Sequence, residues 1–173
     1  MGILVHLNST NTIITRADTI VRETGTRDPE RIAKELGIAI KDVAFDRQKG
    51  VYKVIKRNRF IFIKSDLHEV MRRIVLLHEI GHDQLHRKQA TVFQEFNLFD
   101  MTSNSMEYEA NLFAAQIALP DDDMLDCIYC GYDASQIASA LNSDINLVAL
   151  KVSELSRRGY SFRNIEHRND FLK

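Results

Sequence analysis

Residues 67–86 read LHEVMRRIVLLHEIGHDQLH, and this stretch decides the fold. Its apolar residues recur every three or four positions, which is the period of an amphipathic α-helix, so a long helix is predicted to run to His86. Ser65 and Asp66 stand just ahead of it as candidate N-caps, and Glu69 follows Asp66 by three positions, as in a capping box. The stretch therefore predicts one long helix with a buried face.

Inside that helix, residues 78–82 form an H-E-x-x-H pattern. Four residues make about one helical turn, so His78 and His82 project from the same face and can offer two imidazole nitrogens to one zinc ion. Glu79 is turned by about 100° from His78, which suits a general base acting on a water activated by the metal. The pattern predicts a zinc site, and the alternative is a pair of core histidines.

A catalytic zinc ion usually has three protein ligands, and the next predicted helix, residues 106–119, offers two carboxylates. Glu107 shares its face with small residues that would let the two helices approach closely, whereas Glu109 lines up with bulky ones. We therefore predict Glu107 as the third metal ligand, with Glu109 as the alternative. Asn111, one turn after Glu107, is expected to hydrogen-bond the second nitrogen of a ligand histidine.

A further donor is expected to stabilise the oxyanion that forms during hydrolysis. Tyr52, Tyr108 and His86 are the candidates, and the sequence does not rank them. His86 lies one turn beyond His82, where a straight helix cannot bring it to the same ion. It is expected to be an outer partner of the site or a substrate contact, and Asp83 is a weaker outer candidate.

The region ahead of the long helix combines a helix with strands. The order Asp28-Pro29-Glu30 predicts a helix start, and Gly37 predicts its end. A strand is expected over 38–45, and a hairpin over 50–64, because β-branched and aromatic residues dominate there. The first dozen residues are polar and are expected to form an irregular arm or a short strand.

The predicted hairpin is strongly basic. Residues 47–64 hold seven Lys or Arg and no Asp or Glu. One interpretation is a solvated strand face, and the other is a site that attracts an acidic segment of a partner. An edge strand of this hairpin could also receive a substrate as an added β-strand.

The last third predicts three short helices. Residues 121–123, three aspartates, open the first, which ends at Gly131, and two more follow over 134–141 and 145–158. The last two have the spacing of a helix-turn-helix, so binding to DNA is an alternative function. It is disfavoured because residues 145–155 carry Lys151 as their sole cation, and a helix that tracks phosphates should carry more.

Composition fits one cytoplasmic domain spanning residues 1–173. The chain has 173 residues, 45% of them hydrophobic, and a net charge of −1, which argues against a nucleic-acid binder with a global basic field. Two cysteines are too few for a disulfide framework, no apolar run suits a membrane helix, and no signal peptide is evident. A catalytic core is expected over about 28–120 and a C-terminal helical subdomain over about 121–160. The predicted fold class is α+β: a mostly helical, zincin-like domain, with a small antiparallel sheet packed by the metal helix and a C-terminal helical hairpin.

Together, these segments resemble the ImmA/IrrE family of zinc metallopeptidases. The resemblance covers roughly residues 28–159 and rests on AKELGI at 33–38, HEIGH at 78–82 with the following LH, and EYEANLFAA at 107–115. Family members end the last segment near Leu-Met-Pro, where this chain has Ala118-Leu119-Pro120. Glu107, Asn111 and Phe113 also resemble the third-ligand helix of thermolysin-like enzymes, which supports Glu107 as a ligand.

The resemblance implies a function that spacing alone does not. Small members of the family are commonly encoded by phages and integrative elements beside a repressor, which they cleave at a specific site. By this resemblance the chain is expected to be a Zn2+-dependent endopeptidase whose substrate is a helix-turn-helix repressor. The alternatives are a zinc-binding protein that binds the repressor without cutting it, and a helix-turn-helix regulator that binds DNA.

Overall fold

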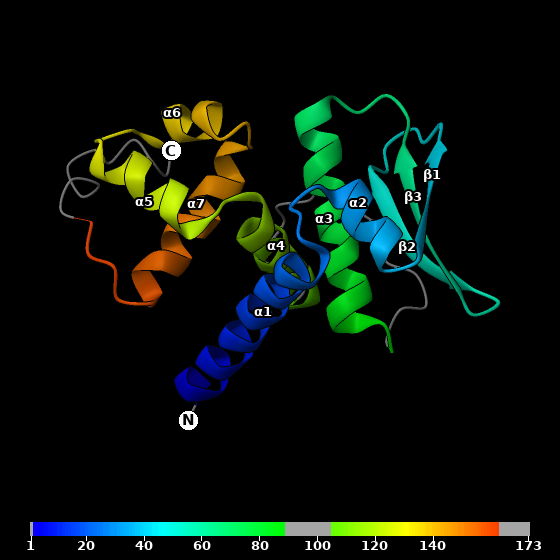
Figure 1. Ribbon diagram of the computed structural model, residues 1–173, viewed down its shortest axis with the longest axis horizontal. Coiled ribbons are helices and arrows are strands. Elements are labelled where there is room, and N and C mark those ends of the chain that lie inside the picture. Colours follow the sequence, from blue (N-terminus) through cyan, green and yellow to red (C-terminus); the bar gives the residue numbers. More distant parts are fainter. Residues whose placement is uncertain (1, 89–104, 163–173) are drawn as a thin grey trace. The chain divides into compact units, whose positions relative to one another are not determined.

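The computed structural model describes residues 2–88 and 105–162, with side chains from residue 10 onward, and the chain divides into two compact units (Figure 1). Among the described residues, the first unit, up to Ala118, contains seven elements: α1 (Gly2–Thr24), α2 (Pro29–Glu35), β1 (Ile38–Val43), β2 (Gly50–Ile55), β3 (Asn58–Lys64), α3 (Glu69–His86) and α4 (Ser105–Ala118). The second, from Leu119, contains α5 (Asp121–Tyr129), α6 (Ala134–Ala140) and α7 (Ile145–Arg157). Within the described ranges, no helix is long and apolar enough to cross a bilayer. The predicted mostly helical α+β class is confirmed.

The small sheet is mixed rather than wholly antiparallel. Its strand order is β1-β3-β2, with β2 antiparallel and β1 parallel to β3. The turn between β2 and β3 consists of Lys56 and Arg57, both in the left-handed region with φ of 49° and 68°, as a tight hairpin requires. Since β1 is parallel and β2 antiparallel to the central strand β3, β1 and β2 run in opposite directions. The antiparallel pattern that we predicted holds for the hairpin alone.

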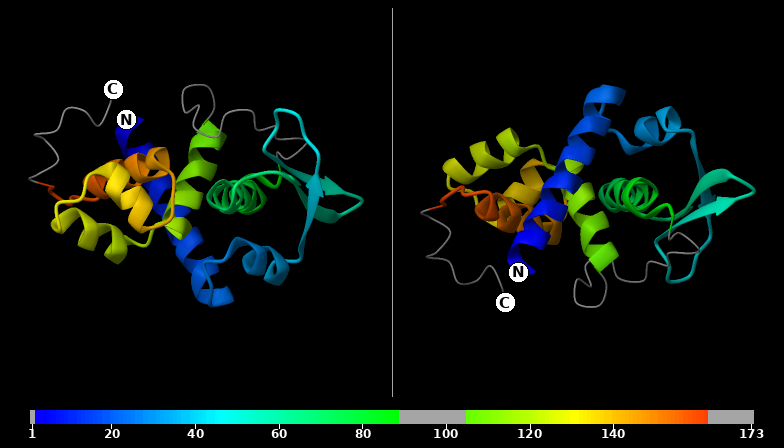
Figure 2. Two further views of the ribbon diagram at one scale, coloured as in Figure 1. Left: turned by 90° about the horizontal axis from the view of Figure 1, so that it is seen from above. Right: turned by 90° about the horizontal axis from the view of Figure 1, so that it is seen from below.

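Helix α3 forms the centre of the first unit. In the two views of Figure 2 it lies between α4 and the sheet, and every residue from Ile74 to Asp83 is buried. A helix with buried residues on all sides contacts neighbours on all sides, which explains why its pattern is apolar well beyond one stripe. Its polar residues in this stretch are therefore held in a low-dielectric interior.

The helix starts were predicted with mixed success. Asp28 caps α2 as predicted, because its carboxylate accepts the Arg31 backbone N–H at 2.8 Å. The capping box predicted for α3 is wrong: the helix begins at Glu69, and His68 precedes it without a side-chain cap. Asp66 instead lies 3.5 Å from Lys64. Burial of the middle of α3 stabilises this helix, so its first turn does not depend on a cap.

The polar arm predicted for the first dozen residues is also wrong. Residues 2–12 belong to α1, whose later residues Ile13, Ala17 and Ile20 are buried at helical spacing. This stripe packs α1 against α4. Arg16 adds a polar contact, donating to the Gln84 side-chain oxygen on α3. The apolar spacing after residue 12 was the signal that could have revealed this helix.

In the second unit, α6 and α7 begin with local caps. Asp133 forms a reciprocal capping box with Gln136, and Asp144 accepts the backbone N–H of Asn146. Lys151 on α7 is fully buried and lies 2.5 Å from a carboxylate oxygen of Asp121. This ion pair joins α5 to α7. The first of the three aspartates thus contributes to the packing of this unit rather than to an open acidic surface.

Candidate metal centre

Two histidines of α3 and one glutamate of α4 converge inside the first unit. The Nε2 atoms of His78 and His82 are 3.0 Å apart. Glu107 places one carboxylate oxygen 3.2 Å from His78 Nε2 and the other 3.4 Å from His82 Nε2. Both histidines are fully buried, and the Glu107 side chain is 19% exposed. The three residues predicted as ligands are therefore brought together.

Close packing of α3 against α4 makes this convergence possible. Gly81 lies between the two histidines in the chain, and a Cβ added there would come within 3.2 Å of the Ala110 backbone. A larger residue at either position would push α4, and Glu107 with it, away from the histidines. Ala110, one of the small residues on the Glu107 face from which we predicted a close approach, does lie at the helix contact, where Phe113 also lies.

The donor set fits a tetrahedral zinc ion. Ligands at about 2.0–2.1 Å from zinc stand about 3.3 Å from one another in a tetrahedron, close to the three separations in this cluster. Two imidazoles and one carboxylate are a common ligand set of catalytic zinc sites that leave a fourth position open. Burial lowers the pKa of His82 to about 4, although Glu107 opposes this shift, so the ring is neutral and able to bind a metal at pH 7.

Each histidine has a second polar neighbour through its Nδ1 atom. The predicted hydrogen bond between Asn111 and His78 is present, because the Asn111 Oδ1 atom, an acceptor, lies 2.9 Å from Nδ1 of His78. His82 Nδ1 lies 3.2 Å from Nδ1 of His86, whose Nε2 lies 2.9 Å from a carboxylate oxygen of Glu109. Glu109, which the sequence offered as the alternative third ligand, thus contacts His86 rather than the cluster of predicted metal ligands.

Glu79 is fully buried on α3, where strand β2 passes closely over it. A Cβ added at Gly50, the first residue of β2, would stand 2.9 Å from Glu79 Oε1 and 2.6 Å from a methyl carbon of Val75. Gly50 is therefore the residue that lets β2 begin beside the carboxylate. Sequence reasoning missed it, because the residue it approaches lies 29 positions further along the chain.

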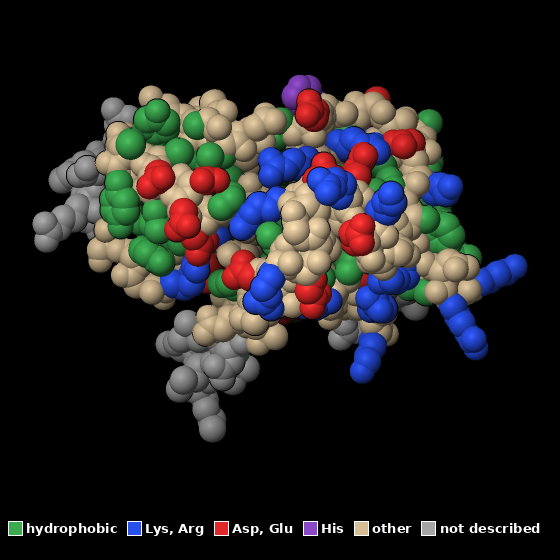
Figure 3. Space-filling view, in the orientation of Figure 1, with side chains coloured by type: hydrophobic (Ala, Val, Ile, Leu, Met, Phe, Trp, Pro, Cys, Tyr) green, Lys and Arg blue, Asp and Glu red, His purple; other side chains and the backbone are tan. Residues whose placement is uncertain are grey.

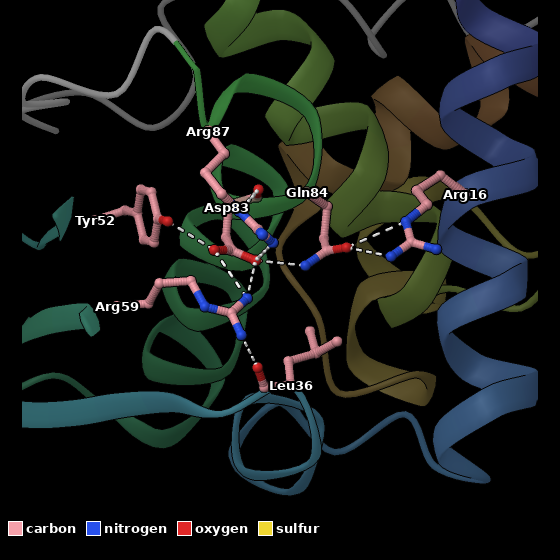
Figure 4. A network of polar contacts seen from close by, with 7 residues as sticks. All are labelled: Arg16, Leu36, Tyr52, Arg59, Asp83, Gln84 and Arg87. Atoms are coloured by element: carbon pink, nitrogen blue, oxygen red, sulfur yellow. Dashed lines mark hydrogen bonds and ion pairs between the residues drawn. The ribbon is translucent and has the colours of Figure 1, made fainter. Parts of the chain in front are cut away.

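A second polar network surrounds Asp83, which follows His82 on α3 (Figure 4). Its fully buried carboxylate accepts the Tyr52 hydroxyl at 2.6 Å and an Arg59 N–H at 3.0 Å. Arg87 donates to it at 2.9 Å. The network ties β2 and β3 to the helix that carries the histidines.

This network changes the interpretation of Tyr52 as an oxyanion donor. Its side chain is fully buried and its hydroxyl donates to Asp83. Burial and this hydrogen bond raise the pKa of Tyr52 well above its ordinary value. The hydroxyl is thus used in packing the sheet on α3. Of the other candidates, His86 contacts Glu109 and His82, and Tyr108 is half-buried on α4.

A peptidase family described as the IrrE N-terminal-like domain matches residues 33–153. The chain belongs to this IrrE-like family. The matched region contains all of α3 and α4, and so it includes the cluster of His78, His82 and Glu107. It excludes α1, which lies before it in the sequence.

Two curated relatives support the same assignment. The "Uncharacterized immunity region protein 2" of Bacillus phage phi105 is 36% identical over 104 residues, 59% of this chain and 65% of that protein. Metallopeptidase ImmA of Bacillus subtilis (strain 168) is 30% identical over 95 residues, 52% of this chain and 56% of that protein. The chain thus matches less than two thirds of the length of either relative. The resemblance to the ImmA/IrrE family that we predicted is confirmed.

Proposed function

We propose that this IrrE-like protein is a zinc-dependent endopeptidase. The observation that carries the proposal is the set of three donor atoms from His78, His82 and Glu107, which all lie within 4.8 Å of one another. The buried carboxylate of Glu79 lies on α3, the helix that carries the two histidines. A relative named Metallopeptidase ImmA, matched over 52% of this chain, supports a metal-dependent peptidase.

Different residues of the protein would perform separate steps of the hydrolysis. When bound by the three ligands, zinc would lower the pKa of a water molecule towards about 7 and polarise the scissile carbonyl. Glu79 would take the proton from the attacking water and deliver it to the leaving amine. Its burial excludes competing solvent and strengthens its interaction with positive charge nearby. Asn111 would hold the His78 ring so that Nε2 faces the metal.

We propose a cytoplasmic transcriptional repressor of a phage or mobile element as the substrate. The family resemblance suggests it, and the name of the phage relative, an immunity region protein, agrees with it. Strand β2 pairs with β3 on one side and, among the described strands, has no partner on the other, so it is an edge. Because β2 begins beside Glu79, a substrate segment that added to this edge would pass close to the general base.

The basic hairpin would favour an acidic substrate segment. Lys56 and Arg57 are exposed at its tip, next to the exposed side chains of Val54 and Ile55. On the face shown in Figure 3, Lys and Arg side chains project at this end of the hairpin. A segment with acidic and apolar residues would match this surface in charge and in hydrophobicity.

The decisive experiment uses the proposed substrate, a purified helix-turn-helix repressor. The purified protein with zinc should produce one defined cut, detected by intact-mass measurement. Chelator should stop the cut, and Glu79→Gln should stop it while zinc still binds. Cleavage by Glu79→Gln at the wild-type rate would contradict the proposed general base.

The role of the hairpin needs its own test. Reversing the charge at Lys53, Lys56 and Arg57 should slow cleavage of the repressor at low ionic strength and have less effect at high salt. A matched control reverses three exposed cations on α1 and α2: Arg22, Arg31 and Lys34. Equal rates of repressor cleavage by the two triple variants would contradict a role of the hairpin in substrate recognition.

A zinc protein that binds the repressor without cutting it is the second candidate. It would bind zinc and the repressor with no change in the repressor's mass. Binding to DNA through α6 and α7 is opposed by the burial of Lys151, which pairs with Asp121 and so cannot reach a phosphate.

A further inference from the structure

His86 and Glu109 form a hydrogen-bonded chain behind His82. His86 lies one turn after His82 on α3, and their Nδ1 atoms are 3.2 Å apart. The opposite ring nitrogen of His86 lies 2.9 Å from Oε2 of Glu109 on α4. His86 is 4% exposed and the Glu109 side chain is 31% exposed, so these two hydrogen bonds lead from the buried cluster towards solvent.

The proton positions in this chain follow from its two ends. At the inner end, Nε2 of His82 lies 3.0 Å from His78 Nε2 and 3.4 Å from Glu107, so its lone pair is the one available to a metal. A neutral His82 ring then carries its proton on Nδ1 and donates it. His86 must accept with its own Nδ1, and its proton is therefore on Nε2.

At the outer end, Glu109 accepts that proton. A carboxylate has acceptors only, so the contact at 2.9 Å requires the proton of His86 to be on Nε2. One arrangement of protons thus satisfies both hydrogen bonds with two neutral rings. Without Glu109, His86 could carry its proton on Nδ1 and would then oppose the donor of His82.

We propose that His86 and Glu109 are a positioning pair, which fixes the orientation and tautomer of His82 so that its Nε2 faces the metal. The inference rests on the proposed use of His78, His82 and Glu107 as zinc ligands. Helix α4 would then support both histidines from outside, His78 through the neutral amide of Asn111 and His82 through the charged carboxylate of Glu109. Such outer partners typically change metal affinity by about 10–100-fold when they are removed.

The pair also accounts for the two glutamates of α4. Residues 107 and 109 are two apart, which sends them to different faces of a helix. Glu107 meets both Nε2 atoms of the cluster, and Glu109 meets His86. Each carboxylate therefore has a separate role, one inside the cluster and one behind it.

The test measures zinc affinity by competition with a chromophoric chelator, with no substrate present. His86→Leu and Glu109→Leu should each weaken zinc binding about 10–100-fold. His86→Asn, whose amide oxygen stands at the position of the His86 Nδ1 atom and can still accept from Nδ1 of His82, should recover most of the affinity. The controls are His68→Leu and Glu69→Leu, at exposed positions at the start of the same helix, which should leave the affinity unchanged.

The double variant, with leucine at both His86 and Glu109, shows whether Glu109 acts on His82 through His86 or whether the two residues act independently. If Glu109 acts through His86, the combined substitution should weaken zinc binding no more than His86→Leu alone. The inference is overturned if the two losses multiply, if Glu109→Leu binds zinc as tightly as the wild type, or if the wild type binds no zinc. Glu109 is partly exposed, so its variant provides the test even if His86→Leu does not fold.

The outcome is independent of the proposed peptidase activity. If no repressor is cut and yet zinc affinity falls as described, the positioning pair stands and the endopeptidase proposal fails. If the wild type cuts the repressor and both variants bind zinc normally, the positioning pair fails alone.

Discussion

Each compact unit of this molecule holds an aspartate between two cationic side chains. In the first unit, Asp83 on α3 lies 3.0 Å from Arg59 on β3 and 2.9 Å from Arg87. In the second, Asp121 lies 2.5 Å from Lys151 and 2.7 Å from Arg158, on and just after α7. The two clusters are alike in charge and differ in which of their members is buried.

In the Asp83 cluster the anion is the fully buried member, whereas in the Asp121 cluster it is the cation Lys151. Asp83 also follows a candidate zinc ligand directly and accepts the hydroxyl of Tyr52 from strand β2. Its contacts therefore fix the sheet on the helix of the metal centre. Asp121 joins α5 to α7 in a unit that contains none of the candidate ligands. The comparison shows that similar ion pairs can support a site in one unit and only packing in the other.

The largest expected effect is that of Asp83→Asn. Removing the charge of a fully buried carboxylate leaves Arg59 uncompensated and should lower the free energy of unfolding by about 3 kcal/mol. Because the same contacts hold β2 and β3 on α3, zinc affinity should fall too. Urea unfolding followed by circular dichroism and chelator competition would measure the two effects. Unchanged zinc affinity in a folded variant would place Asp83 outside the support of the site.

Asp121→Asn is the matched substitution in the second unit. It should lower the free energy of unfolding by a similar amount, about 3 kcal/mol, because it removes the carboxylate partner of the fully buried Lys151 ammonium. Zinc affinity and the rate of repressor cleavage should equal those of the wild type. A loss of zinc binding in a folded Asp121→Asn protein would contradict the conclusion that the Asp121 cluster supports packing alone.

Acid should weaken the Asp121 cluster in a defined range. Burial raises the pKa of Asp121, but hydrogen bonds from Arg158 and Lys151 outweigh burial and lower the pKa from 3.8 to about 2. A lowered pKa in the folded state stabilises the protein above about pH 4, and this stabilisation is lost as the pH falls through about 2. The difference in unfolding free energy between wild type and Asp121→Asn should therefore shrink from pH 5 to pH 2. A constant difference would contradict the assigned pKa.

Tyr52→Phe should have the smallest effect. It removes one hydrogen bond to Asp83, while Arg59 and Arg87 still bind the carboxylate, so the free energy of unfolding should fall by about 1 kcal/mol. Cleavage of the repressor by the folded variant should continue at a similar rate, because the hydroxyl faces Asp83. A loss of activity with zinc affinity intact would restore Tyr52 as an oxyanion donor.

Contacts between residues that are close in the sequence were predictable, because several of them follow from the geometry of a single helix. The i, i+4 spacing of His78 and His82 fixes both on one face of α3, and the same spacing in α4 brought Asn111 to His78 once Glu107 had been chosen. The hairpin followed from its β-branched and aromatic residues. Helix α1 was missed because the polar residues before position 12 hid the apolar spacing that follows.

The sequence by itself determined the metal-binding pattern, because the spacing of donors within one helical turn depends on backbone geometry alone. Only the tertiary structure decided which strand residues contact Asp83, the approach of Gly50 to Glu79, and the assignment of Glu109 to His86. These contacts join residues at least 23 positions apart, counting from His86 to Glu109, and they form when helices and strands pack. The charges of the protein illustrate the same point. The net charge of −1 can be counted from the sequence, but only the fold shows that Lys151 and Asp121 form an ion pair within the second unit.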